Sequence, residues 1–254
     1  MMVVRCREDA ERLRSLARAM YFSNETVDAF LAGATAAQAR AVASVLELEA
    51  DVRERNKRER LYRRARFPQP KSFADYDFSR VSMPEGYGPD DLRSLAFLDG
   101  AEGFVLHGPT GRGKTHMAIA MGAAAVEAGR PVRFFTAADL VLWLKRVHRD
   151  GALEAAMREL SRCDMLIIDE FGYVPLDIEG ARLLFQVVAD CYERRSLVIT
   201  TNIEFSKWGT VLADDKLASA MIDRIVHHGR LIEFTGPSRR MDAALMLAGA
   251  REAV

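Results

Sequence analysis

The alternation of apolar and polar positions divides the chain into a helical first part and a longer second part of strands and helices. Over residues 8–66, apolar side chains recur at helical spacing with charged residues between them, which predicts amphipathic helices. Pro68 and Pro70 end this pattern, because proline lacks an amide donor and clashes with the preceding helical turn. We therefore expect a small all-helical N-terminal domain over residues 1–69 and a second domain over residues 70–254.

In the second part, short apolar segments alternate with segments of helical periodicity. The expected strands cover residues 103–107, 131–135, 165–168, 197–200 and 231–234. The expected helices cover residues 114–128 and 178–193, with two more that begin near Asp139, a candidate N-cap, and near Asp215. This alternation is typical of a parallel sheet with helices on both faces. The predicted fold is therefore α/β, a three-layer sandwich around a parallel sheet.

The composition is that of an ordinary globular protein. Of 254 residues, 49% are apolar and 28% are charged, and the formal net charge is zero. The cysteines Cys6, Cys163 and Cys191 lack the spacing of a zinc site, and we interpret them as buried apolar residues. The first residues lack the apolar run of a signal peptide, and the uncharged stretch 117–126 is too short to span a bilayer. We expect a cytoplasmic protein with no membrane partner.

The strongest chemical signal is a glycine-rich segment between an expected strand and an expected helix. It fits the phosphate-loop pattern G-x-x-x-x-G-K-[ST] in the strand–loop–helix context that the pattern requires. Its members are Gly108, Pro109, Thr110, Gly111, Arg112, Gly113, Lys114 and Thr115. The backbone amides and the helix N-terminus can bind phosphate, Lys114 can reach the β- and γ-phosphates, and Thr115 can coordinate Mg²⁺. We expect ATP and Mg²⁺ as cofactors, with the variable-position Arg112 solvated.

Two carboxylates follow the apolar segment 165–168. A buried parallel strand would present Asp169 at its carboxyl end, where ligands bind in such sheets, and Asp169 is expected to hold Mg²⁺ together with Thr115. Glu170 stands beyond the metal ligand, where a carboxylate can orient and deprotonate the attacking water. The alternative for Glu170 is an exposed loop acid.

Two polar residues further along the chain give weaker signals. Asn202 ends an apolar segment and could contact the γ-phosphate and the attacking water, although Thr-Thr-Asn is also ordinary turn chemistry. Arg224 lies in the helix that begins near Asp215, and it could stabilise charge on a phosphoryl group held by a neighbouring subunit. The alternative for Arg224 is a surface arginine paired with an acid.

His227 and His228 precede Gly229 at the end of the same helix. We expect them to cap the helix and complement its dipole. A metal site is the less favoured interpretation, because adjacent residues of a helix point in different directions.

Two segments could serve binding or packing. Residues 53–66 contain eight basic and two acidic residues, which favours DNA or an acidic partner; the alternative is a solvated helix with internal ion pairs. The aromatic side chains of residues 73–78 could lie beside an adenine or could simply close the core.

Together these motifs resemble the IstB/DnaC-like branch of the AAA+ ATPases. The stretches that carry the resemblance are Gly108–Thr115, Ile168–Pro175, Tyr192–Ser196, Ile199–Asn202 and Asp223–His228. The Asp-Glu-Phe-Gly-Tyr and Arg-Ile-Val-His-His runs are typical of the IstB side. The resemblance covers about residues 70–240, and it implies a P-loop NTPase (AAA+) fold with an abbreviated C-terminal lid.

The resemblance also implies roles for single residues. Lys114 and Thr115 match the nucleotide-binding motif, and Asp169 and Glu170 match the metal-binding and water-activating pair. The remaining matches are Asn202 with the first sensor, Arg224 with a finger that acts across a subunit interface, and Arg240 with the second sensor. Arg239 stands where the family usually has an aromatic residue, so either of these two neighbouring arginines could be that sensor.

The function implied is that of a transposition helper encoded by an insertion sequence. Such a protein is an ATPase that binds double-stranded DNA in an ATP-dependent way, assembles with itself into rings or spirals, and stimulates a transposase. A replicative helicase loader similar to DnaC is an alternative. A non-hydrolysing ATP-controlled switch and a P-loop kinase of a small metabolite are further alternatives.

Overall fold

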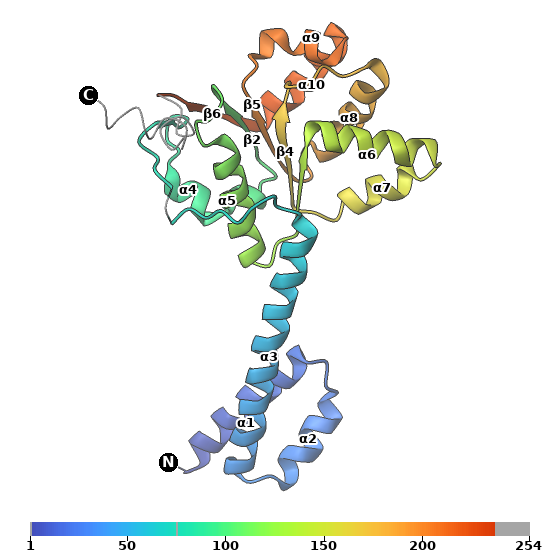
Figure 1. Ribbon diagram of the computed structural model, residues 1–254. Coiled ribbons are helices and arrows are strands. Elements are labelled where there is room, and N and C mark those ends of the chain that lie inside the picture. Colours follow the sequence, from blue (N-terminus) through green and yellow to red (C-terminus); the bar gives the residue numbers. More distant parts are fainter. Residues whose placement is uncertain (1, 75, 237–254) are drawn as a thin grey trace, which may run out of the picture. The chain divides into compact units, whose positions relative to one another are not determined.

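The computed structural model describes residues 2–74 and 76–236, and the chain divides into two compact units (Figure 1). The smaller unit covers residues 1–60 and the larger covers residues 61–254. This division falls earlier than the predicted boundary after residue 69. The side chains that join the end of the long third helix to the core of the larger unit are apolar: Leu61, Tyr62 and Ala65.

The smaller unit is built from α1 (Met2–Ala19), α2 (Asn24–Gly33) and the first part of α3 (Ala36–Ala65). Thr35 caps the start of α3. Its hydroxyl accepts a hydrogen bond from the Gln38 amide at 3.3 Å, and its own amide donates to Gln38 Oε1 at 2.8 Å. This reciprocal pair satisfies two amides that a helix start leaves unpaired. The buried side chains at the centre of the unit are Leu13, Ala39 and Ala43.

The larger unit contains the alternating strands and helices that the apolar pattern predicts. Its elements are β1 (Val81–Ser82), α4 (Pro89–Ser94), η1 (Ala96–Leu98), β2 (Gly103–His107), α5 (Lys114–Glu127), β3 (Val132–Thr136), α6 (Ala137–Arg149), α7 (Leu153–Leu160), β4 (Met165–Phe171), α8 (Ile178–Cys191), β5 (Ser196–Thr201), η2 (Phe205–Lys207), α9 (Trp208–Leu212), α10 (Asp215–His227) and β6 (Gly229–Phe234). All the predicted strands are present, and β4 extends beyond its expected end.

The sheet has the strand order β1-β6-β2-β5-β4-β3. Each pair of neighbouring strands from β6 to β3 is parallel, which confirms the predicted parallel sheet. The edge strand β1 was not predicted, and it pairs antiparallel to β6, with Val81 opposite Phe234. The carboxyl ends of β2, β4 and β5 therefore lie side by side at one edge, which is where ligands bind in sheets of this kind.

Helices cover both faces of the sheet, with α4 and α5 on one side and α6 to α10 on the other (Figure 1). Residues 165–168 of β4 show why this part of the strand is apolar throughout. Met165 and Ile167 pack into the core on the α5 side, whereas Leu166 and Ile168 pack into the core on the α6 and α8 side. A strand buried on both faces needs apolar side chains at every position. The three-layer α/β prediction is confirmed.

The two cysteines of the larger unit lie in its core. Cys163 and Cys191 are buried, and burial raises the pKa of these thiols to about 11 and about 12, so both stay protonated at neutral pH. This confirms the interpretation of these two as buried apolar residues; the Cys6 side chain lies outside the described part. None of the helices described combines the length and the apolar character that a bilayer crossing requires.

Candidate nucleotide-binding site

Glycines shape the loop between β2 and α5. Gly108, Gly111 and Gly113 have φ values of +148°, +81° and +93°, in the region that L side chains rarely adopt. A Cβ atom on Gly108 would lie 2.4 Å from the carbonyl oxygen of Phe234, so a larger residue would force β6 away. The conformation that the phosphate-loop pattern requires is thus built into the packing of the loop against the sheet.

The lysine of the loop is held inside it. Lys114 is only 5% exposed, and its Nζ donates to the carbonyl oxygens of Gly108 at 2.6 Å and Pro109 at 2.9 Å. A buried ammonium group needs such acceptors. The positive charge is therefore fixed beside the loop backbone, where a phosphate would meet it.

An aromatic residue from the 73–78 segment packs against the same loop. Tyr76 is buried, its hydroxyl donates to the Gly113 carbonyl oxygen at 3.3 Å, and its ring lies edge-on to His116 with centroids 5.0 Å apart. Tyr76 belongs to the core on the α5 side of the sheet and also lines the cavity beside the loop. This segment thus closes the core and borders the site at once.

The expected metal ligands lie together. Asp169 is 4% exposed, at the carboxyl end of β4, and its Oδ1 accepts hydrogen bonds from the hydroxyls of Thr115 at 2.9 Å and Thr200 at 2.5 Å. A threonine hydroxyl and a carboxylate are the hard oxygen ligands that Mg²⁺ prefers. The residues present therefore fit the ion that the sequence predicts.

Thr200 is a site residue that the sequence analysis missed. It lies in β5 beside β4, where its hydroxyl joins Asp169 to the amide of Glu170, which donates to it at 3.0 Å. The available signal was a buried threonine near the carboxyl end of a strand adjacent to the one carrying the carboxylates. The polar residue singled out instead, Asn202, follows the end of β5.

Glu170 occupies a β-bulge. Along β5, Ile168 pairs with Ile199 and Phe171 pairs with Thr201, so β4 has one residue more than β5 between these two pairs. Glu170 consequently has φ +59° and an exposed side chain. A non-glycine residue in this region costs about 1–3 kcal/mol and persists where the surroundings enforce it. Here the bulge turns Glu170 out of the strand, so that it lines the cavity beside the phosphate loop.

One cavity of about 300 Å³ joins these features. The loop residues Thr110 to Thr115 form one wall, and the ends of β4 and β5 contribute Glu170 and Thr200. Across it, the hydroxyls of Thr110 and Tyr173 lie 3.0 Å apart.

Arg112 also lines this cavity, with its Nε enclosed and lacking a hydrogen-bond partner in the described structure, so Arg112 is less solvated than expected. Asn202 is exposed and does not line this cavity, whereas Thr200 of β5 does.

Arg224 lies at the opposite edge of the sheet. Its Nη1 donates to the Ala220 carbonyl oxygen at 2.7 Å, and its guanidinium lies 5.0 Å from the Phe185 ring centroid. It borders a small cavity together with Gly103, the first residue of β2. The phosphate loop follows the last residue of β2, a five-residue strand that spans roughly 16 Å. The chain's own phosphate loop is therefore out of reach of Arg224. Arg239 and Arg240 lie outside the described residues.

Known proteins resemble this chain in sequence and in fold. A protein named for ATP binding in insertion sequence IS232 of Bacillus thuringiensis subsp. berliner is 38% identical over 193 residues, covering 76% of this chain and 77% of that protein. A similarly named protein of insertion sequence IS5376 from Geobacillus stearothermophilus is 37% identical over 196 residues, covering 76% and 78%. AMPPCP-bound DnaA from Aquifex aeolicus shares the fold, with a TM-score of 0.54 at 17% identity over 70% of this chain and 54% of that one.

The match to a protein family extends over both units. Residues 8–245 match the family described as IstB-like ATP binding protein, and this range contains the phosphate loop, the β4 carboxylates and the helix that carries Arg224. The resemblance noted from the motifs alone is thereby confirmed. The chain belongs to the IstB-like ATP binding protein family.

Proposed function

We propose that this protein is a Mg²⁺-dependent ATPase that assembles on double-stranded DNA and assists a transposase. The observation that carries the ATPase proposal is the group formed by Thr115, Asp169, Thr200 and Glu170 at the edge of the phosphate-loop cavity. It combines two oxygen ligands for a metal with a separate carboxylate, and a binding site alone would not need that separate carboxylate.

Each residue of this group has a proposed task. The loop amides and Lys114 bind the phosphates, and Thr115 and Asp169 hold the metal, with Thr200 fixing the carboxylate of Asp169 by its hydroxyl. Bound Mg²⁺ and the triphosphate supply the electrophilic phosphorus and a stabilised leaving group. Glu170 orients the attacking water and accepts its proton. Asn202 is exposed and does not line the cavity described beside the phosphate loop, so its sensor role is the least supported.

The assembly and partner proposals rest on other features. Arg224 lies away from the chain's own phosphate loop, so a role in catalysis requires a second copy of the chain, as in a ring or spiral. The basic side chains from Arg53 to Arg60 are exposed, although Arg53 pairs with Glu49 at 2.7 Å, and they are the proposed contacts with DNA phosphates or an acidic partner. The names of the relatives place them in insertion sequences, which favours transposition over helicase loading as the process served.

A steady-state assay with and without duplex DNA tests this proposal. We expect Mg²⁺-dependent release of phosphate, stimulation by DNA that weakens as salt is raised, and loss of ATP binding in Lys114→Ala. A chain that binds ATP in the Lys114-dependent way without releasing phosphate under any condition would be a switch. Phosphate transfer to a small acceptor without a response to DNA would instead indicate a kinase.

Removal of the Thr200 hydroxyl should weaken the metal site. Thr200→Val keeps the shape of the side chain but leaves Asp169 with one hydroxyl partner fewer, and partners of a metal ligand contribute about 10–100-fold in affinity or activity. We expect the Mg²⁺ concentration for half-maximal ATPase rate to rise about tenfold. Thr201→Val is the matched control, because the Thr201 hydroxyl donates to the Phe171 carbonyl oxygen at 2.8 Å instead. An equal Mg²⁺ dependence in both variants would contradict the role of Thr200.

A further inference from the structure

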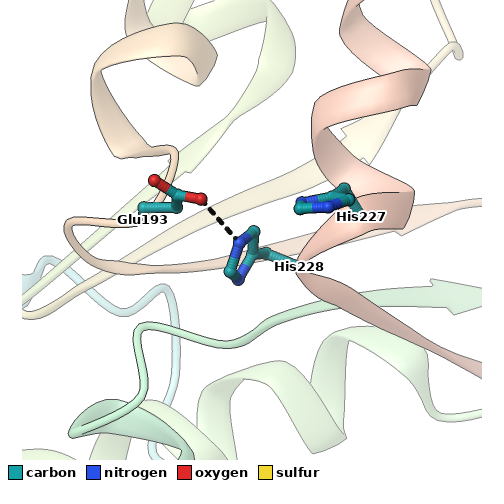
Figure 2. Close-up of side chains that lie close together, drawn as sticks. All are labelled: Glu193, His227 and His228. Atoms are coloured by element: carbon teal, nitrogen blue, oxygen red, sulfur yellow. Dashed lines mark hydrogen bonds and ion pairs between the residues drawn. The ribbon is translucent and has the colours of Figure 1, made fainter.

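The edge of the sheet opposite the phosphate loop carries a cluster of metal-binding side chains. Glu193, His227 and His228 each offer a ligand atom within 4.8 Å of the others (Figure 2). We propose that these residues bind one divalent transition-metal ion, with Zn²⁺ as the best match. The site is separate from the Mg²⁺ site of the proposed ATPase, and nothing in the proposed hydrolysis requires it.

The end of helix α10 brings the histidines together. His227 is its last residue, and His228 follows as the C-cap with φ −116° and ψ 14°. Because His228 has left helical geometry, the two rings do not diverge as neighbours in a helix would, and their centroids lie 4.7 Å apart. The sequence-based expectation that adjacent histidines point in different directions was wrong for this reason.

The third ligand comes from the turn between α8 and β5. Glu193 has φ +56°, a left-handed conformation that is unfavourable for a residue with a side chain. Its Oε1 lies 2.9 Å from His228 Nε2 (Figure 2). The carboxylate oxygen and the imidazole nitrogen thus already lie close to the separation that two ligands of one ion require.

Tyr192 fixes the ring of His227. The Tyr192 hydroxyl lies 2.9 Å from His227 Nδ1, and its ring lies edge-on to His228 with centroids 5.2 Å apart. Histidine ligands commonly have their second ring nitrogen in such a hydrogen bond, which sets the tautomer and the orientation of the ring. Because Nδ1 is engaged by Tyr192, the nitrogen of His227 that is left to bind the ion is Nε2.

The donor set identifies the class of ion. Two imidazoles with one carboxylate suit Zn²⁺ and its neighbours among the transition metals, whereas Mg²⁺ and Ca²⁺ prefer oxygen ligands throughout. Tetrahedral Zn²⁺ with bonds of about 2.0–2.1 Å needs ligand atoms about 3.3 Å apart. Glu193 and His227 are exposed and His228 is partly exposed, so rotation about their side-chain bonds can bring the ligand atoms to this spacing. Three protein ligands leave the fourth position to water or to a side chain from another molecule.

Metal binding to the untagged full chain in excess Mg²⁺ tests the proposal. We expect one Zn²⁺ per chain by calorimetry and, with Co²⁺ in its place, the strong visible absorption of a four- or five-coordinate site. Glu193→Gln and His227→Gln should each weaken Zn²⁺ binding at least tenfold, since even the loss of a residue that hydrogen-bonds to a metal ligand lowers metal affinity by about 10–100-fold. The control His148→Gln alters another exposed histidine beside a glutamate, Glu179, at 3.3 Å, and should leave binding unchanged.

The outcomes separate this site from other metal-binding groups. Unchanged stoichiometry and affinity in the double variant His227→Gln/His228→Gln would overturn the proposal, as would failure of the wild type to bind Zn²⁺ at micromolar concentrations. His227 is exposed, so its single substitution keeps the test available where the double variant folds poorly. The absorption and calorimetric signals do not depend on ATP hydrolysis, so an inactive ATPase would not affect the result.

Discussion

Replacement of Glu170 by glutamine should abolish ATP hydrolysis while ATP binding persists. The bulge in β4 turns this side chain into the cavity beside the phosphate loop, and a positioned general base contributes about 10²–10⁴-fold to such a reaction. Glutamine keeps the size of the side chain and loses the ability to take a proton. We expect the turnover rate to fall by about 10²-fold or more, measured as phosphate release, with the affinity for ATP little changed.

A matched control separates this effect from a general change of charge. Glu204 is also exposed and follows the neighbouring strand β5, but it does not line the cavity described beside the phosphate loop. Glu204→Gln should therefore hydrolyse ATP at the wild-type rate. Normal hydrolysis by Glu170→Gln would remove Glu170 from the mechanism, and loss of ATP binding by this variant would show that it acts on the site as a whole.

The parts of the site that the sequence predicted are those fixed by local rules. The phosphate loop has a pattern whose glycines answer steric demands within a few residues, as Gly108 does against Phe234. The segment 165–168 that leads to Asp169 is apolar at every position because both faces of β4 are buried there. The loop conformation requires glycines at fixed spacing and the buried strand requires a run of apolar residues, and both patterns can be recognised in the sequence.

The parts that were missed depend on how distant segments meet. The contact of Thr200 with Asp169 is set by the register of β5 on β4, which no short pattern records. The start of α6 was placed at Asp139, whereas the hydroxyl of Thr136 caps it and the Asp139 amide is the donor to that hydroxyl, at 3.1 Å. Both residue types suit a cap, and only the path of β3 into the helix decides between them. The direction of the His228 side chain likewise depends on the residue at which α10 ends, which the apolar pattern does not fix.

Arg224→Ala should be as damaging as Glu170→Gln, by a different route. An arginine that stabilises the transferring phosphoryl group contributes about 10³–10⁵ in rate, and Arg224 lies at the edge of the sheet away from its own phosphate loop. We therefore expect its loss to reduce turnover by about 10³-fold while ATP binding is unaffected. Arg194→Ala is the control, since Arg194 lies near the same edge and pairs with Asp190 at 3.1 Å.

A mixture of the two inactive variants distinguishes shared active sites from separate ones. In a head-to-tail assembly, the site of an Arg224→Ala subunit, which keeps Glu170, can meet the intact Arg224 of a Glu170→Gln subunit. Random assembly at equal concentrations makes this correct pairing at about one site in four, so the mixture should recover a measurable fraction of wild-type activity although each variant alone is inactive. Recovery of this kind has no explanation within a single chain. A mixture as inactive as its components, in which co-assembly is verified by sedimentation, would instead show that Arg224 does not act across a subunit interface and would remove the structural reason for proposing a ring or spiral.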